Sequence, residues 1–91
     1  MITMEQIKEK QKQLNKAEYA LLRLERINAM LKLLESPYCN VVLHEAINTD
    51  SNYRLMVSTV LNDQEQAVLT KGIKMTLEFA RQRIEKEIEK I

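Results

Sequence analysis

The chain has 91 residues, 45% of them hydrophobic and 30% charged, and it holds one Gly, one Pro, one Cys and no Trp. This length makes one domain, residues 1–91, and the scarcity of turn-forming residues excludes a sandwich, a barrel or a loop-rich enzyme. The 14 basic and 13 acidic residues give a net charge of +1, which disfavours nucleic acid as a partner.

Residues 3–35 are predicted to form one long helix. Thr3 and Gln6 have the spacing of a capping box, and Ser36-Pro37 is a stop signal. If Ile7, Leu14 and Leu21 are core positions of a heptad, the next is Asn28, a polar residue of the kind that fixes register or oligomeric state. The apolar residues that recur at helical spacing are Ile7, Leu14, Ala17, Leu21, Leu24, Leu31 and Leu34.

The spacing of apolar residues is no longer helical between residues 40 and 60. Two short segments rich in β-branched residues, 40–47 and 53–60, flank the turn-forming side chains of 48–52. This pattern predicts an antiparallel β-hairpin. Alternation places one face against the helices, namely Val41, Leu43, Ile47, Leu55 and Val57. The other face is mixed in character and holds Val42, His44, Ala46, Arg54, Met56 and Ser58.

Residues 62–90 are predicted to form the second helix, with a capping box from Asn62 and Glu65. Its apolar stripe repeats every eleven residues, which predicts a nearly straight or slightly right-handed packing seam. The stripe consists of Leu69, Ile73, Leu77, Ala80, Ile84, Ile88 and Ile91. The expected fold class is therefore α+β and mostly helical, in the order long helix, two-stranded hairpin, long helix.

Both helices also carry apolar residues away from their main stripes. These are Leu22, Met30 and Leu33 in the first helix and Val68, Met75 and Phe79 in the second. One hairpin cannot cover all of these faces, so we expect the chain to associate with itself through the helices, as a dimer or a higher closed assembly. Gly72, inside the second helix, is either a point of close approach between chains or a tolerated position. The expected interface consists of Leu21, Leu24, Asn28, Leu31, Gly72, Met75, Phe79 and Ile84.

Like charges repeat at four-residue spacing in both helices. One column holds Lys8, Lys12 and Lys16, and the other holds Glu85 and Glu89. Because like charges at this spacing repel one another, we expect antiparallel packing to bring the two columns together, within the chain or across a dimer.

The sequence offers no catalytic or metal-binding constellation. His44 is the only histidine and Cys39 the only cysteine, so a zinc site within one chain lacks ligands. We interpret His44 as a half-exposed strand residue and Cys39 as a buried small hydrophobe. We expect no enzymatic activity, no cofactor and no metal.

The N-terminal segment and the single cysteine bear on compartment. The first residues are charged and lack the apolar core of a signal peptide, and no apolar run approaches the ~20 residues of a membrane span. A lone cysteine cannot form a disulfide within the chain and fits a reducing compartment. We expect a cytoplasmic protein that does not bind membranes.

The residues best suited to bind a ligand lie on the mixed face of the hairpin and its flanks. Arginine offers a planar fork for phosphate or carboxylate, and tyrosine offers a stacking plane. Such a set fits an anionic, nucleotide-like ligand at an oligomer interface, and it fits a protein partner nearly as well. It consists of Tyr38, His44, Tyr53, Arg54 and Ser58, joined by Arg23 and Arg26 from the adjacent half of the first helix.

The C-terminal two thirds of the chain has a hairpin that ends in Val60-Leu61-Asn62-Asp63 and a helix that closes with residues 83–91, RIEKEIEKI. In size, composition and architecture it resembles small helix–hairpin–helix proteins of bacteriophages and mobile elements. The resemblance implies counter-defence, through inhibition of host defence proteins or sequestration of nucleotide immune signals. We therefore expect a non-enzymatic homo-oligomeric binding protein that captures a small anionic signal or a host protein. The alternative is a structural or chaperone-like coiled-coil adaptor.

Overall fold

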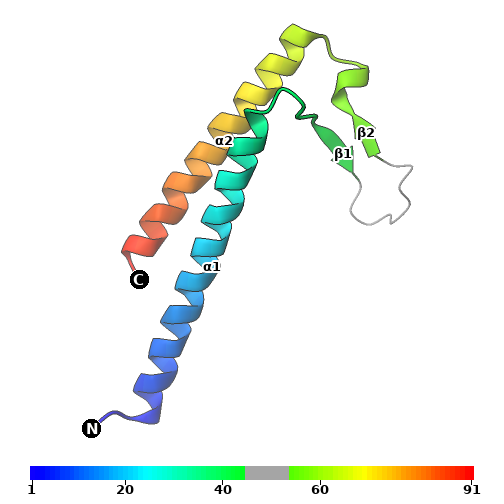
Figure 1. Ribbon diagram of the computed structural model, residues 1–91. Helices are drawn as coiled ribbons and strands as arrows, with labels where there is room; N and C mark the ends of the chain where they lie inside the picture. The colour runs from blue at the N-terminus through cyan, green and yellow to red at the C-terminus, as the bar shows by residue number, and fades with distance from the viewer. Residues whose placement is uncertain (45–53) are drawn as a thin grey trace.

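The computed structural model of the chain describes residues 1–44 and 54–91. The elements follow in the order α1 (Met4–Leu34), β1 (Val42–His44), β2 (Arg54–Met56), the 3-10 helix η2 (Val57–Thr59) and α2 (Asp63–Glu89). The two long helices lie side by side and antiparallel, and the hairpin projects from one end of the pair (Figure 1). The α+β, mostly helical fold with a hairpin between two long helices is therefore confirmed.

Both helices begin where the sequence predicts. The Thr3 hydroxyl accepts from the Gln6 backbone N–H at 3.2 Å, and the Gln6 side chain accepts from the Thr3 N–H at 2.9 Å. Asn62 and Glu65 make the same reciprocal pair at 2.8 and 3.0 Å. These bonds satisfy N–H groups that the first turn of a helix otherwise leaves without partners.

The helices meet along one seam, which we define by its buried centre, Ala20, Ile27 and Ile84. Ala20 and Ile84 are only 1% and 2% exposed. On α1 the buried and half-buried apolar residues alternate at three- and four-residue spacing, which is the heptad pattern. They are Ala17, Ala20, Leu24, Ile27, Leu31 and Leu34. On α2 the predicted stripe is buried or half-buried from Leu69 to Ile88, and only Ile91 at its end is exposed.

Three residues of the predicted α1 stripe lie outside this seam. Ile7, Leu14 and Leu21 are each at least half exposed. Two apolar series with seven-residue spacing run beside each other on α1, and the series through Ala17 and Leu24 is the one that faces α2. The N-terminal part of α1 also runs past the end of α2, so α2 cannot cover it (Figure 1).

The hairpin has the predicted antiparallel pairing but shorter strands. Leu43 pairs with Leu55 and His44 with Arg54, so the two predicted faces are respected. The predicted strand 53–60 is wrong beyond Met56, because Val57–Thr59 turn into η2, where the Thr59 hydroxyl donates to the Met56 carbonyl at 2.7 Å. The predicted turn at 48–52 and the strand positions Ala46, Ile47 and Tyr53 lie outside the described residues.

The apolar face of the hairpin does not pack on the helices as predicted. Leu43 and Leu55 remain 66% and 69% exposed. The hairpin stands away from the helix pair, and η2 is the segment that joins it to the start of α2 (Figure 1). Because the chain turns at η2 instead of continuing as a strand, the hairpin is held off the side of the helices.

Truncation of the seam tests its importance for stability. Ile84→Ala should lower the free energy of unfolding by about 2–5 kcal/mol, because it opens a cavity at a site that is 2% exposed. The same truncation at the exposed Ile2, which precedes α1, should change it by less than about 0.5 kcal/mol. Urea unfolding followed by circular dichroism measures both, and equal effects of the two substitutions would contradict the assigned core.

Candidate functional site

Polar contacts flank the seam on both sides. On one flank the Arg23 Nη2 is 2.7 Å from the Glu87 Oε2, and the guanidinium lies 4.6 Å from the centre of the Tyr19 ring. The Arg23 Nε is buried and has no acceptor in the described chain. Glu87 therefore contacts the guanidinium group through Nη2 and leaves Nε unpaired. On the other flank the Arg81 Nη1 donates to the Asn28 Oδ1 at 3.4 Å. These contacts fix how α1 and α2 are aligned along their length.

The predicted ligand-binding set is not brought together as a whole. His44 and Arg54 lie directly opposite each other on neighbouring strands, and both are exposed. Tyr38 is fully exposed in the segment after α1, and Ser58 lies in η2 rather than on a strand. Tyr53 lies outside the described residues.

The two arginines expected to join that set from the first helix lie on α1, as predicted. Arg23 is engaged with Glu87 near the C-terminal end of α2. Arg26 is exposed and lies on the same side of α1, because residues three apart in a helix are neighbours. Both residues therefore belong to the surface of the helix pair.

The predicted oligomer interface divides into two groups. Leu24, Leu31 and Ile84 pack in the seam between the chain's own helices, and Asn28 bonds to Arg81 there. For these four residues the chain itself supplies the partner, because the antiparallel return of α2 covers this side of α1. The remaining four stay exposed, and they are Leu21, Gly72, Met75 and Phe79.

The lysine and glutamate columns do not meet within the chain. Among the described residues the ion pairs are Arg23 with Glu87 and, at 4.0 Å, Arg81 with Glu85. Lys16 lines a groove with Lys90 at the end of α2, so Lys12 and Lys8 lie one and two turns beyond that end. The prediction is therefore wrong within one chain, and across a dimer it stays a prediction.

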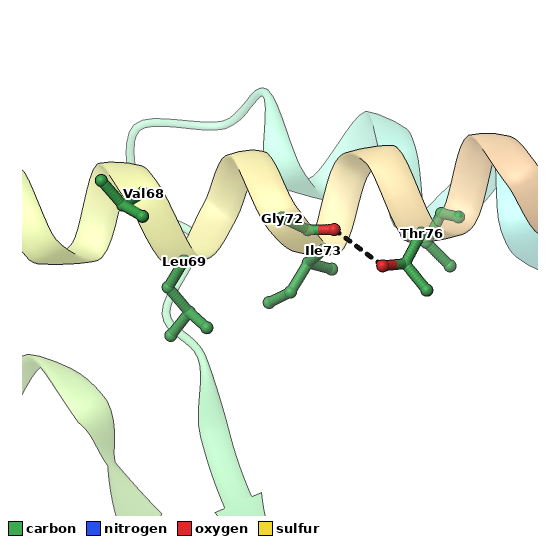
Figure 2. Close-up of a pocket in the computed structure, with 6 residues that line it drawn as sticks. Val68, Leu69, Gly72, Ile73 and Thr76 are labelled. Carbon is green, nitrogen blue, oxygen red and sulfur yellow. Dashed lines mark hydrogen bonds between the residues drawn. The ribbon is translucent and has the colours of Figure 1, made fainter.

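An apolar groove of about 520 Å³ runs along the first half of α2 (Figure 2). Gly72 lies at its centre, where an added Cβ would meet no atom within 4 Å. The Thr76 hydroxyl turns back to donate to the Gly72 carbonyl at 2.8 Å and so presents its methyl group to the groove. The residues that line this groove are Val68, Leu69, Gly72, Ile73, Thr76 and Leu77.

A second apolar hollow, of about 320 Å³, lies between the hairpin and η2. It is lined by Leu43, Leu55, Met56, Val57, Thr59, Val60 and Leu61. Sequence reasoning assigned Leu43 and Leu55 to a buried face and so did not anticipate an open hollow there.

Two charged grooves lie beside each other near the end of α2, with volumes of about 350 and 340 Å³. They share Glu87 and Lys90. The first is lined by Lys16, Tyr19, Ala20, Arg23, Glu87, Lys90 and Ile91, and the second by Phe79, Gln82, Arg83, Lys86, Glu87 and Lys90. These grooves were not predicted from the sequence. The seven-residue spacings of Lys16 with Arg23 and of Arg83 with Lys90 could have indicated them, because residues seven apart share one side of a helix.

The described residues contain no cluster of three or more His, Cys, Asp or Glu side chains placed to hold a metal ion. Cys39 is exposed, so the prediction that it is buried is wrong; it lies in the segment between α1 and β1, away from the seam. Over residues 1–44 and 54–91, the helices lack the combination of length and apolar character needed to cross a membrane. No family model, curated protein or solved structure matches the chain.

The open space at Gly72 makes a specific prediction. Gly72→Ala should raise the free energy of unfolding of the chain by about 0.5–1 kcal/mol, because alanine loses less backbone entropy in a helix and its Cβ finds room. Chemical unfolding at low protein concentration measures the effect. A loss of stability would show that the groove is filled in the folded chain.

Proposed function

We propose that the protein is a non-enzymatic binding protein that works as an assembly of identical chains. The observation that carries this proposal is the surface that one chain leaves open. Its accessible area is 8139 Å², whereas a compact monomer of 10.7 kDa exposes about 5,500 Å². Its radius of gyration is 18.9 Å, against about 12 Å for a compact chain of this length.

The open surface is apolar in the places where a second chain could pack. Val68 is 70% exposed at the rim of the Gly72 groove, and Met75 follows it seven residues later on the same side of α2. A protein interface of ordinary size removes about 800 Å² from each partner. The chain exposes about 2,600 Å² more surface than a compact monomer of its mass, and this area is large enough for such an interface.

Capture of a ligand or a partner fits this architecture better than catalysis does. A binding site needs a hollow and a few polar groups, and the helix pair and the hairpin base both offer hollows among the described residues. Inhibition by capture is also the role that the resemblance to small bacteriophage proteins implies. The assembled chain would bind its target stoichiometrically.

One observation favours the alternative, a structural or chaperone-like adaptor. The projecting hairpin presents Leu43 and Leu55 to solvent above an apolar hollow, and exposed apolar patches of this kind bind other proteins. In that case the helix pair would serve as the base of the assembly and the hairpin would hold the client protein.

Self-association is tested by placing one charge in the apolar rim. Val68→Glu should convert the assembly to monomers, because a carboxylate buried in an apolar contact loses its hydration. The matched control is Gln82→Glu, which adds the same charge on the same side of α2, fourteen residues later, where the native residue is already polar and exposed. Sedimentation velocity over a range of concentrations gives the state of each variant.

Two outcomes of the sedimentation experiment decide whether the chain self-associates through the apolar rim. Assembly of the wild-type chain, lost in Val68→Glu and kept in Gln82→Glu, supports the proposal. A wild-type chain that remains a folded monomer at ~100 μM, where weak assemblies with dissociation constants in the micromolar range are populated, would overturn it.

A further inference from the structure

Basic residues gather on one side of the helix pair near the end of α2, although the net charge is only +1 and the opposite flank holds both signs, with Arg81, Lys71 and Lys74 beside its acidic residues. Side chains seven residues apart lie on one side of a helix. On α1 this rule groups Lys16 with Arg23, and it groups Lys12 with Tyr19 and Arg26. On α2 it groups Arg83 with Lys90, and the two charged grooves show that these residues border the same flank as Lys16.

We name this side the basic face. It consists of Lys12, Lys16, Arg23, Arg26, Arg83, Lys86 and Lys90. The opposite flank, marked by the contact between Arg81 and Asn28, carries acidic residues at the same level of the pair. They are Glu18, Glu25, Glu78 and Glu85.

We propose that the basic face binds a small ligand that carries several phosphate groups. The two grooves on this face meet at Lys90 and have volumes of about 350 and 340 Å³, which lie within the range of small-molecule sites. Glu87, the one carboxylate that both grooves share, is already paired with Arg23 at 2.7 Å. The ammonium groups of Lys16, Lys86 and Lys90 therefore have no such partner among the described ion pairs and are available to an anion.

The chemistry of the face favours phosphate linked to a planar group. The Tyr19 ring is 61% exposed and lines the first groove, and the Arg23 guanidinium is held against it at 4.6 Å. An exposed ring beside fixed cations stacks a planar group while the cations contact its phosphates. A nucleoside polyphosphate has both parts.

The face is bounded, which argues for a small ligand and against a nucleic acid. From Lys12 to Arg26 it extends about 21 Å along α1. Seven residues before Lys16 the same side carries Glu9, and seven residues after Arg23 it carries the apolar Met30. Lys8 lies one turn before Lys12, but a polyanion that continued along the helix would also meet the Glu9 carboxylate at that end and an apolar surface at the other.

This inference goes beyond the proposed self-association and does not depend on it, because all of the basic face lies within one chain. It is tested by isothermal titration of the full chain with inorganic tripolyphosphate at an ionic strength of about 0.15 M, where the Debye length is about 8 Å. The double variant Lys16→Gln with Lys90→Gln should bind at least about tenfold more weakly, because it removes two cations from one groove.

The matched control is Lys71→Gln with Lys74→Gln. It removes the same total charge. Lys71 and Lys74 are exposed, and they lie on the opposite flank because they precede Glu78 and Arg81 by seven residues. The control should bind tripolyphosphate within about twofold of the wild-type chain, because distant exposed charges are screened. The same titration with a nucleoside triphosphate should show tighter binding than with tripolyphosphate. Tyr19→Ala should remove this difference in affinity.

Three results would overturn the proposal. The first is no binding of tripolyphosphate by the wild-type chain, and the second is equal weakening in both double variants, which would mark a diffuse charge effect. The third is tighter binding of a single-stranded oligonucleotide than of the triphosphate, which would assign the face to nucleic acid. Sedimentation of the same samples reports self-association separately, so the two proposals can fail independently.

Discussion

The contact between α1 and α2 along Ala20, Ile27 and Ile84 is the interaction on which the rest of the structure depends. Most of the stability of a helix in a protein comes from the packing of its apolar face, and a two-stranded hairpin with three-residue strands is marginal on its own. The capping boxes fix where the helices begin, but they add only about 1 kcal/mol each. Tertiary packing must therefore come from the seam, where Ala20 and Ile84 are almost completely buried.

The seam also determines the surface of the molecule. A single pair of helices can bury only one apolar stripe of each helix. All the remaining apolar residues of α1 and α2 therefore stay exposed. The same alignment places Arg23 with Glu87 on one flank and Arg81 with Asn28 on the other. Basic residues that are scattered along the sequence are thereby gathered in space on the basic face.

Local rules were sufficient to predict the elements, but not how they pack. The capping boxes and the α2 stripe follow from spacing within a few turns, and all of them are observed apart from the exposed Ile91. On α1, two seven-residue series compete, and Ala20 is too small to stand out in an apolar pattern. Only the position of α2 decides between the series, and that is a long-range property.

The candidate site shows the same limit. The placement of His44 and Arg54 on one face of the hairpin follows from strand alternation and was predicted, whereas their direct pairing depends on the register, which alternation does not give. The expectation that Arg23 joins the hairpin surface from the first helix did not anticipate its contact with Glu87, which lies 64 residues away in the sequence. The basic face needs residues from both helices in one alignment, so neither helix alone reveals it.

Self-association and anion binding centre on different parts of the helix pair, although Phe79 of the expected interface also lines the second charged groove. The apolar groove at Gly72 belongs to the first half of α2, near the hairpin, whereas the charged grooves belong to its last turns. Gly72 and Lys90 are 18 residues apart, or about 27 Å along the helix axis. An assembly that buries Val68 and Met75 therefore leaves Lys16 and Lys90 open to solvent. Each chain of such an assembly keeps its own basic face, so the number of bound anions should rise in step with the number of chains.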